Sequence, residues 1–155
     1  MEFLADIHTK AVHFPIALLI TYSFLEIIGI IFKKKLFTQS AFVVLITGII
    51  GIFLSVLSGN QAFEAYQYWN ETSSNIFNSH QFYANFTTWF FVFITALRTF
   101  LVVKKKFNGV FKYLFILFAM IGIFFIYKTA EYGGELINKF GVGTEYKNEQ
   151  MQNNF

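Results

Sequence analysis

Histidine is the residue type in this chain best suited to chemistry, and it occurs three times, as His8, His13 and His80. A neutral imidazole binds metal ions and haem iron through one ring nitrogen, and it can also carry a proton. Imidazoles in apolar segments are costly without a partner, so they indicate a function. His8 and His13 stand at the start of the first apolar segment, and His80 stands at the start of a later one.

One interpretation of the three histidines is a site for a single b-type haem. His13 and His80 would bind the iron from its two sides, because helix bundles build cofactor sites from side chains on facing helices. On one straight helix His8 would lie about 140° around the axis from His13, so His8 would support the site unless Pro15 marks a break. The chain has no cysteine, which excludes covalent c-type haem and iron–sulfur clusters.

Two other interpretations of the histidines stay open. The same three imidazoles, with Glu131 or Glu135 as a further ligand, would suit zinc, copper or non-haem iron. The two glutamates are four residues apart and share a helical face. In the third interpretation the histidines have structural or proton-linked roles and bond only to backbone and water.

The amino-acid composition predicts an integral membrane protein. Hydrophobic residues make up 55% and charged residues only 14% of the 155-residue chain, whereas soluble proteins carry charge on about a quarter of their residues. The apolar residues form runs of about 20, the length that a helix needs to cross a bilayer. We expect membrane-spanning helices at about 13–32, 40–58, 80–103 and 110–130. They form one domain, residues 1–143, followed by a polar tail at 144–155.

Charge predicts how the spans are connected and oriented. Short lysine-rich loops, Lys33–Lys35 and Lys104–Lys106, follow the first and third spans, and a longer polar connection, 59–79, follows the second. Positively charged loops stay in the cytoplasm, so both termini and all three histidines are expected on the outer, periplasmic side. The fold class is therefore an all-α, up-down-up-down four-helix bundle in the membrane. The early residues Glu2 and Asp6 do not suit a cleavable signal peptide, so we expect the first span to be retained.

Several residues within the spans are assigned structural roles. Glu26 and Arg98 lie at a similar depth inside the cytoplasmic ends of the first and third spans, which predicts an ion pair between them. Small residues let helix backbones approach closely in a bilayer, and a stripe of them can also clear room for a flat cofactor. The glycines assigned to helix packing are Gly48, Gly51, Gly133 and Gly134.

The chain also resembles a known bacterial family in two motifs. The first contains His8, Val12, His13, Phe14, Pro15, Ile16, Ala17, Leu18 and Leu19. The second, near the end, contains Gly133, Gly134, Leu136, Gly141, Val142 and Gly143. Together with Glu26, Gly48, Gly59 and His80, they resemble the membrane domain-of-unknown-function family 2231. Thr9 replaces the proline that usually follows the first histidine in that family.

What the resemblance implies is a four-helix protein of the bacterial inner membrane. Some members are similar to domains that are fused with c-type cytochrome modules, which implies a redox setting and favours haem b over the other cofactors. The resemblance assigns no activity, and whether the chain is an enzyme stays open.

The leading hypothesis is a b-type cytochrome-like protein that relays electrons between the quinone pool and a periplasmic carrier, such as a c-type cytochrome. The alternatives are a non-catalytic accessory subunit of a larger membrane complex and a metal-handling membrane protein. The expected surroundings are the lipid bilayer and, in the alternative, other subunits of that complex. Nucleic acid is excluded as a partner because the chain lacks a basic face on a soluble fold.

Overall fold

The computed structural model describes residues 2–143, with side chains from residue 7 onward. The predicted tail, 144–155, lies outside these described residues. The helices are α1 (Glu2–Ala11), α2 (His13–Ile31), α3 (Lys35–Ala65), α4 (Glu71–Val103) and α5 (Phe111–Glu135), and α5 continues into the π-helical segment η1 (Leu136–Phe140).

Four stretches of the described chain are long and apolar enough to cross a membrane. They are Ile7–Ile31, Lys35–Ala65, Glu71–Val103 and Phe111–Phe140. Between residues 2 and 143 no segment forms a β-strand. The prediction of an all-α protein with four membrane-spanning helices is therefore confirmed.

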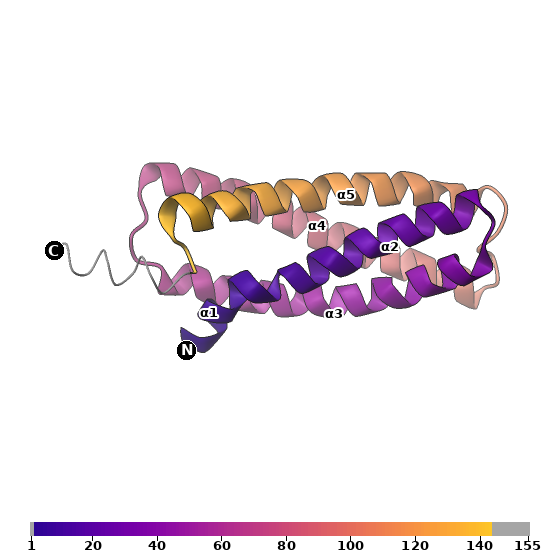
Figure 1. Cartoon of the computed structure of the whole chain (residues 1–155), viewed down its shortest axis with the longest axis horizontal. Coiled ribbons are helices and arrows are strands. Elements are labelled where there is room, and N and C mark those ends of the chain that lie inside the picture. The colour runs from indigo at the N-terminus through magenta and orange to yellow at the C-terminus, as the bar shows by residue number, and fades with distance from the viewer. Residues whose placement is uncertain (1, 144–155) are drawn as a thin grey trace.

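The four long helices run side by side, alternating in direction along the chain (Figure 1). The turns at 32–34 and 104–110 lie at one end of the bundle, which we call the lysine end. The connection at 66–70 lies at the other end, together with residues 2 and 143, and we call it the histidine end. Since α2 and α4 both pack against α3 and α5, α2 and α4 occupy opposite corners of the bundle.

A break separates α1 from α2 at Val12, three residues before Pro15. Proline has no backbone N–H, so the Ala11 carbonyl loses the helical bond that residue 15 would normally donate. The backbone stays close to helical, because Val12 N donates to His8 O at 3.1 Å and Ile16 N donates to Val12 O at 3.3 Å. Figure 1 shows the resulting bend between the two helices. The possible break considered at Pro15 is therefore present, and His8 is released from the straight-helix geometry.

Two predicted helix ends were wrong at the histidine end. α3 continues to Ala65 instead of ending near Ser58, and α4 begins at Glu71 instead of His80. Asn70 starts α4 with a capping box, in which Ser73 N donates to Asn70 Oδ1 at 2.8 Å and Asn70 N donates to Ser73 Oγ at 2.9 Å. Hydropathy marks where hydrocarbon ends, whereas a polar helix can continue beyond it. The polar connection shrinks from 59–79 to 66–70, and His80 lies inside α4 instead of in its first turn.

Close contacts between helices use the small residues of α3. A Cβ on Gly48 would lie 2.8 Å from the Leu19 side chain, and one on Gly51 would lie 3.0 Å from the Pro15 side chain. Both glycines are buried, so α3 presents this face to α2. The predicted packing role of Gly48 and Gly51 therefore agrees with the contacts. These contacts fix the rotation of α3, which places its serines toward α1.

Candidate functional site

A cavity of about 300 Å³ lies between the helices toward the histidine end. His8 from α1, His13 from α2 and His80 from α4 all line it. Isoleucine, leucine and glycine residues make up much of the remaining wall. The structure therefore brings all three histidines to one apolar cavity, although they come from distant parts of the sequence.

His80 is held by a hydrogen bond to the neighbouring helix α5. Its Nδ1 lies 3.0 Å from the Thr129 backbone carbonyl oxygen. A carbonyl only accepts, so the hydrogen is on Nδ1 and the Nε2 of the neutral ring keeps its lone pair. The ring also lies against Gly133, where a Cβ would come within 3.0 Å of His80 Cε1. Gly133 thus allows the imidazole to lie close to the α5 backbone.

His8 is held in the same way by α3. Its Nδ1 lies 2.9 Å from Ser58 Oγ. The Ser58 hydroxyl donates its own hydrogen to the Ser55 carbonyl at 3.2 Å, so it accepts from Nδ1–H and leaves His8 Nε2 as a base. The ring lies against Gly59, where a Cβ would come within 2.9 Å of His8 Cε1.

The two rings therefore form a pair with matching chemistry. Each donates through Nδ1 to an oxygen of the adjacent helix and keeps Nε2 for another partner, which is how proteins orient metal-ligating histidines. They come from α1 and α4, two helices far apart in the sequence that both line this cavity. Sequence reasoning gave His8 only a supporting role, since the break at Val12 could not be located from spacing.

His13, the first residue of α2, is exposed at the wall of the cavity. Its predicted pairing with His80 across one cofactor stays a prediction, but its ring shows no comparable hydrogen bond to a neighbouring helix among the described residues. The hydrogen-bonding geometry favours His8 over His13 as the histidine that pairs with His80.

The two glutamates proposed as metal ligands lie outside the cavity wall. Glu131 Oε2 is 2.7 Å from Lys128 Nζ, and Glu135 Oε2 is 3.4 Å from Lys139 Nζ. Within the described part of the chain, no three histidine, aspartate or glutamate side chains gather in a way that could hold a metal ion. The structure therefore does not bring the predicted carboxylates to the histidines.

The sequence analysis missed the polar residues of α4 that face the cavity. Gln81, Asn85 and Thr88 line it beside His80, and Asn60 joins them from α3. The α4 residues recur every four or three positions in an otherwise apolar span, which is the signal that could have identified them. Gly134 also lines the cavity, and a Cβ there would meet no atom within 4 Å, so its contacts show no packing role.

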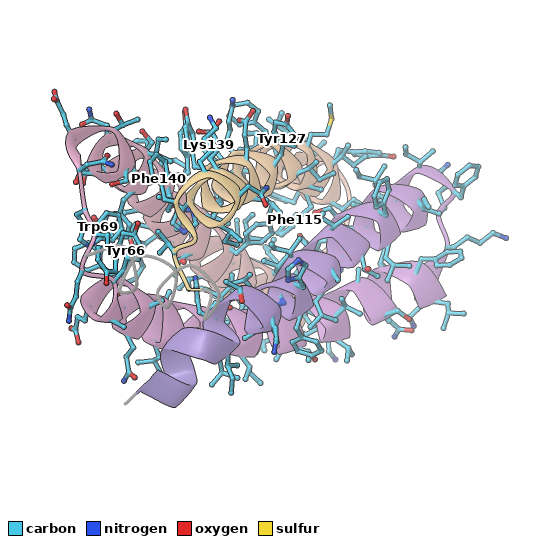
Figure 2. The ribbon with its side chains drawn as sticks, turned by 60° about the vertical axis from the view of Figure 1, so that its left-hand side comes forward. Tyr66, Trp69, Phe115, Tyr127, Lys139 and Phe140 are labelled. Atoms are coloured by element: carbon cyan, nitrogen blue, oxygen red, sulfur yellow. The ribbon has the colours of Figure 1, made fainter. Side chains whose placement is uncertain are left out.

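An aromatic cluster closes the histidine end. Tyr66 donates from its hydroxyl to the Phe140 carbonyl at 3.1 Å, and its ring packs edge-on against Trp69 at 4.8 Å between centroids. Figure 2 shows Tyr66 and Trp69 together at the connection between α3 and α4. Burial and the neighbouring Tyr68 raise the pKa of Tyr66. Val142, which lines the cavity, is buried in the same cluster.

A comparison with family models decides the family of this chain. The model described as "Predicted membrane protein (DUF2231)" matches residues 5–146, well over half of the sequence. The chain belongs to the DUF2231 family. No curated protein and no solved structure matches the chain. The resemblance drawn from the sequence is thereby confirmed, and all three histidines of this DUF2231 protein lie within the matched region.

Glu26 and Arg98 meet toward the lysine end of the DUF2231 bundle, away from the cavity. Arg98 Nε lies 3.3 Å from Glu26 Oε1, and Arg98 Nη2 donates to Glu26 Oε2 at 3.4 Å. The structure brings this predicted pair together between α2 and α4.

Proposed function

We propose that this DUF2231 protein is a membrane electron carrier that holds one b-type haem between His8 and His80. One observation carries the proposal. Two imidazoles from α1 and α4 line one apolar cavity, each with Nδ1 bonded to an adjacent helix and Nε2 left as a base. When bound, the haem would supply reversible one-electron chemistry through its iron.

The residues around the cavity suit such a group. Gly59 and Gly133 let the two imidazoles lie close to the helix backbones. The cavity volume of about 300 Å³ is at the lower end of the range for ligand sites. Asn60, Gln81 and Asn85 add amide groups to the apolar wall, and such groups can bond the carboxylates of a porphyrin.

Haem is favoured over zinc, copper or non-haem iron by the number of ligands. A bare metal ion takes three or four protein ligands, whereas two axial imidazoles are enough for a porphyrin-bound iron. The described residues hold no cluster of three metal-ligating side chains. The two carboxylates that could complete one are paired with lysines.

We further propose where the electrons pass. The lysine end faces the cytoplasm of a bacterial inner membrane, because its turns carry Lys33–Lys35 and Lys104–Lys106. The histidine end then faces the periplasm, where a c-type cytochrome or another complex subunit would exchange electrons with the site. Quinone in the bilayer is the partner on the membrane side.

The test is the reduced-minus-oxidised visible spectrum of the purified protein from haem-replete cells. The wild type and His13→Ala are expected to show a b-type spectrum, and His8→Ala and His80→Ala are expected to lose it. A spectrum lost in His13→Ala and kept in His8→Ala would assign the ligands to His13 and His80 instead. A wild type without any b-type spectrum would overturn the proposal and favour an accessory subunit.

A further inference from the structure

A second buried polar site lies outside the proposed haem site. Tyr22 and Glu26 are fully buried and Arg98 is 2% exposed. They lie between α2 and α4 in the half of the bundle next to the lysine end. Charged groups in the apolar part of a membrane protein are costly, and they commonly mark a path for ions or protons.

The ion pair in this site is loose. Its two N–O contacts measure 3.3 and 3.4 Å, whereas charge-assisted bonds of this kind are usually about 2.7–2.9 Å. Arg98 also donates from Nη2 to the Thr38 carbonyl at 3.2 Å, and its Cζ lies 3.0 Å from the centre of the Phe107 ring. Because the guanidinium is shared among three partners, the charge of Glu26 is only partly compensated.

Several polar atoms of the site have no hydrogen-bond partner. Among the described residues, Tyr22 Oη and Arg98 Nη1 make no hydrogen bond, and Arg98 Nε and Glu26 Oε1 make only their mutual ion-pair contact at 3.3 Å. Tyr22 and Glu26 are four residues apart on α2, so their side chains share one face, and Tyr22 interacts electrostatically with both Glu26 and Arg98. Buried polar atoms that lack a protein partner are usually bridged by an internal water. A water accepts up to two hydrogen bonds and donates up to two, so Tyr22 Oη and Arg98 Nη1 as donors and Glu26 Oε1 as acceptor suit a single water.

The site is close to the lysine end. Glu26 is five residues before Ile31, the last residue of α2, which corresponds to about 8 Å along the axis. Thr38, which accepts from Arg98, belongs to the first turns of α3 and is only half-buried. A chain of one or two waters is long enough to connect Glu26 with that end of the bundle.

We propose that Tyr22, Glu26 and Arg98 enclose a buried water and form a proton-exchange site that opens to the lysine end. The carboxylate of Glu26 takes one proton on Oε1 from this water, which is replenished by a proton from the aqueous side. Tyr22 donates its hydroxyl hydrogen to the water, and Arg98 keeps its charge throughout. No electron moves in this step, and only the proton crosses from solvent to the carboxylate.

The other groups that face Glu26 carry little charge of their own. α2 contributes Tyr22 and α4 contributes Arg98, and both interact with Glu26 electrostatically. Around the guanidinium, α3 offers the Thr38 carbonyl. The rings near Arg98 are Phe42, Phe107 and Phe115. Among the described residues, protonation at this site is therefore set by Glu26 with these two partners.

Infrared difference spectroscopy of the full-length protein tests the proposal. In a pH titration, we expect a carboxylic-acid C=O band that grows as the pH falls, shifts in D₂O and is absent from Glu26→Gln. The matched control is Glu131→Gln, which removes an exposed carboxylate and should keep the band. A Glu26 that stays a carboxylate, or stays protonated, over the whole range in which the protein is folded would overturn the proposal.

Tyr22→Phe provides a second measurement if Glu26→Gln does not fold. The change removes only the hydroxyl that donates to the water, so the carboxylate loses part of its polar surroundings and the C=O band should already appear at a higher pH than in the wild type. An unchanged band would overturn the water bridge. These infrared readouts do not depend on visible absorbance, so they are independent of whether haem is bound.

Discussion

At the residue scale, Ser58 and Thr129 decide which nitrogen of each histidine is available to a ligand. Ser58 acts through its side chain, so it can be changed without altering His8 itself. Ser55 lies in the same cavity wall, and its hydroxyl has no hydrogen-bond partner in the part of the chain that the structure describes, while the Ser55 backbone carbonyl accepts from Ser58. Alanine variants of the two serines therefore distinguish the loss of the Ser58–His8 hydrogen bond from a general change in the polarity of the cavity wall.

We expect Ser58→Ala to weaken haem binding by about 10- to 100-fold, the usual effect of removing the group that orients a metal-ligating histidine. Ser55→Ala keeps the backbone carbonyl and should bind haem as the wild type does. Haem titration followed by visible absorbance gives both affinities. Equal losses in the two variants would contradict the assigned orientation of His8.

The glycine beside His80 allows a second residue-scale test. In Gly133→Ala the new Cβ would lie 3.0 Å from His80 Cε1, so the ring must move away from its hydrogen bond with Thr129. We expect reduced haem occupancy and an altered b-type spectrum. Gly134→Ala is the matched control, since its Cβ meets no atom within 4 Å; a comparable loss there would show that the effect comes from the helix and not from the ring.

At the scale of elements, the Glu26–Arg98 pair connects α2 with α4. Arg98→Met leaves the carboxylate buried and unpaired, and we expect this to cost about 3–5 kcal/mol of stability. The double variant Glu26→Leu with Arg98→Met removes both charges and should recover much of that loss. Thermal unfolding in detergent measures both. If Arg98→Met is as stable as the wild type, the loose Glu26–Arg98 pair contributes little to stability.

The start of α4 depends on the Asn70 capping box. Asn70→Ala removes the acceptor of Ser73 N, and we expect a loss of about 1 kcal/mol in denaturant unfolding. Asn75, exposed one turn into α4, is the control position, where alanine should be neutral or slightly favourable. Equal destabilisation at the two positions would mean that the cap does not set this helix end.

At the scale of the whole molecule, the lysine end is expected to face the cytoplasm. The chain has no cysteine, so single cysteines can be introduced without background. A membrane-impermeant thiol reagent added to intact cells should label Gln67→Cys, an exposed position in the 66–70 connection, and should label Lys106→Cys only after permeabilisation. The reverse pattern would place the histidine end in the cytoplasm.

The sequence alone predicted the features that depend on local composition. Apolar runs near 20 residues located all four spans, lysines marked the two turns at one end, and matched depth paired Glu26 with Arg98. Pro15 left a break between His8 and His13 open as a possibility. These features depend on the composition of one segment and on the solvent around it, so they can be predicted without knowing which helices pack against each other.

Other features required contacts between segments. Hydropathy could not show that α4 extends to Glu71, because a capped polar helix continues beyond the hydrocarbon. Spacing favoured His13, whereas the tertiary structure gives His8 and His80 the matching hydrogen bonds, to Ser58 and Thr129. Those bonds depend on how each helix is rotated about its axis. Rotation is decided by the interhelical contacts at Gly48, Gly51, Gly59 and Gly133, which exist only once the helices are packed.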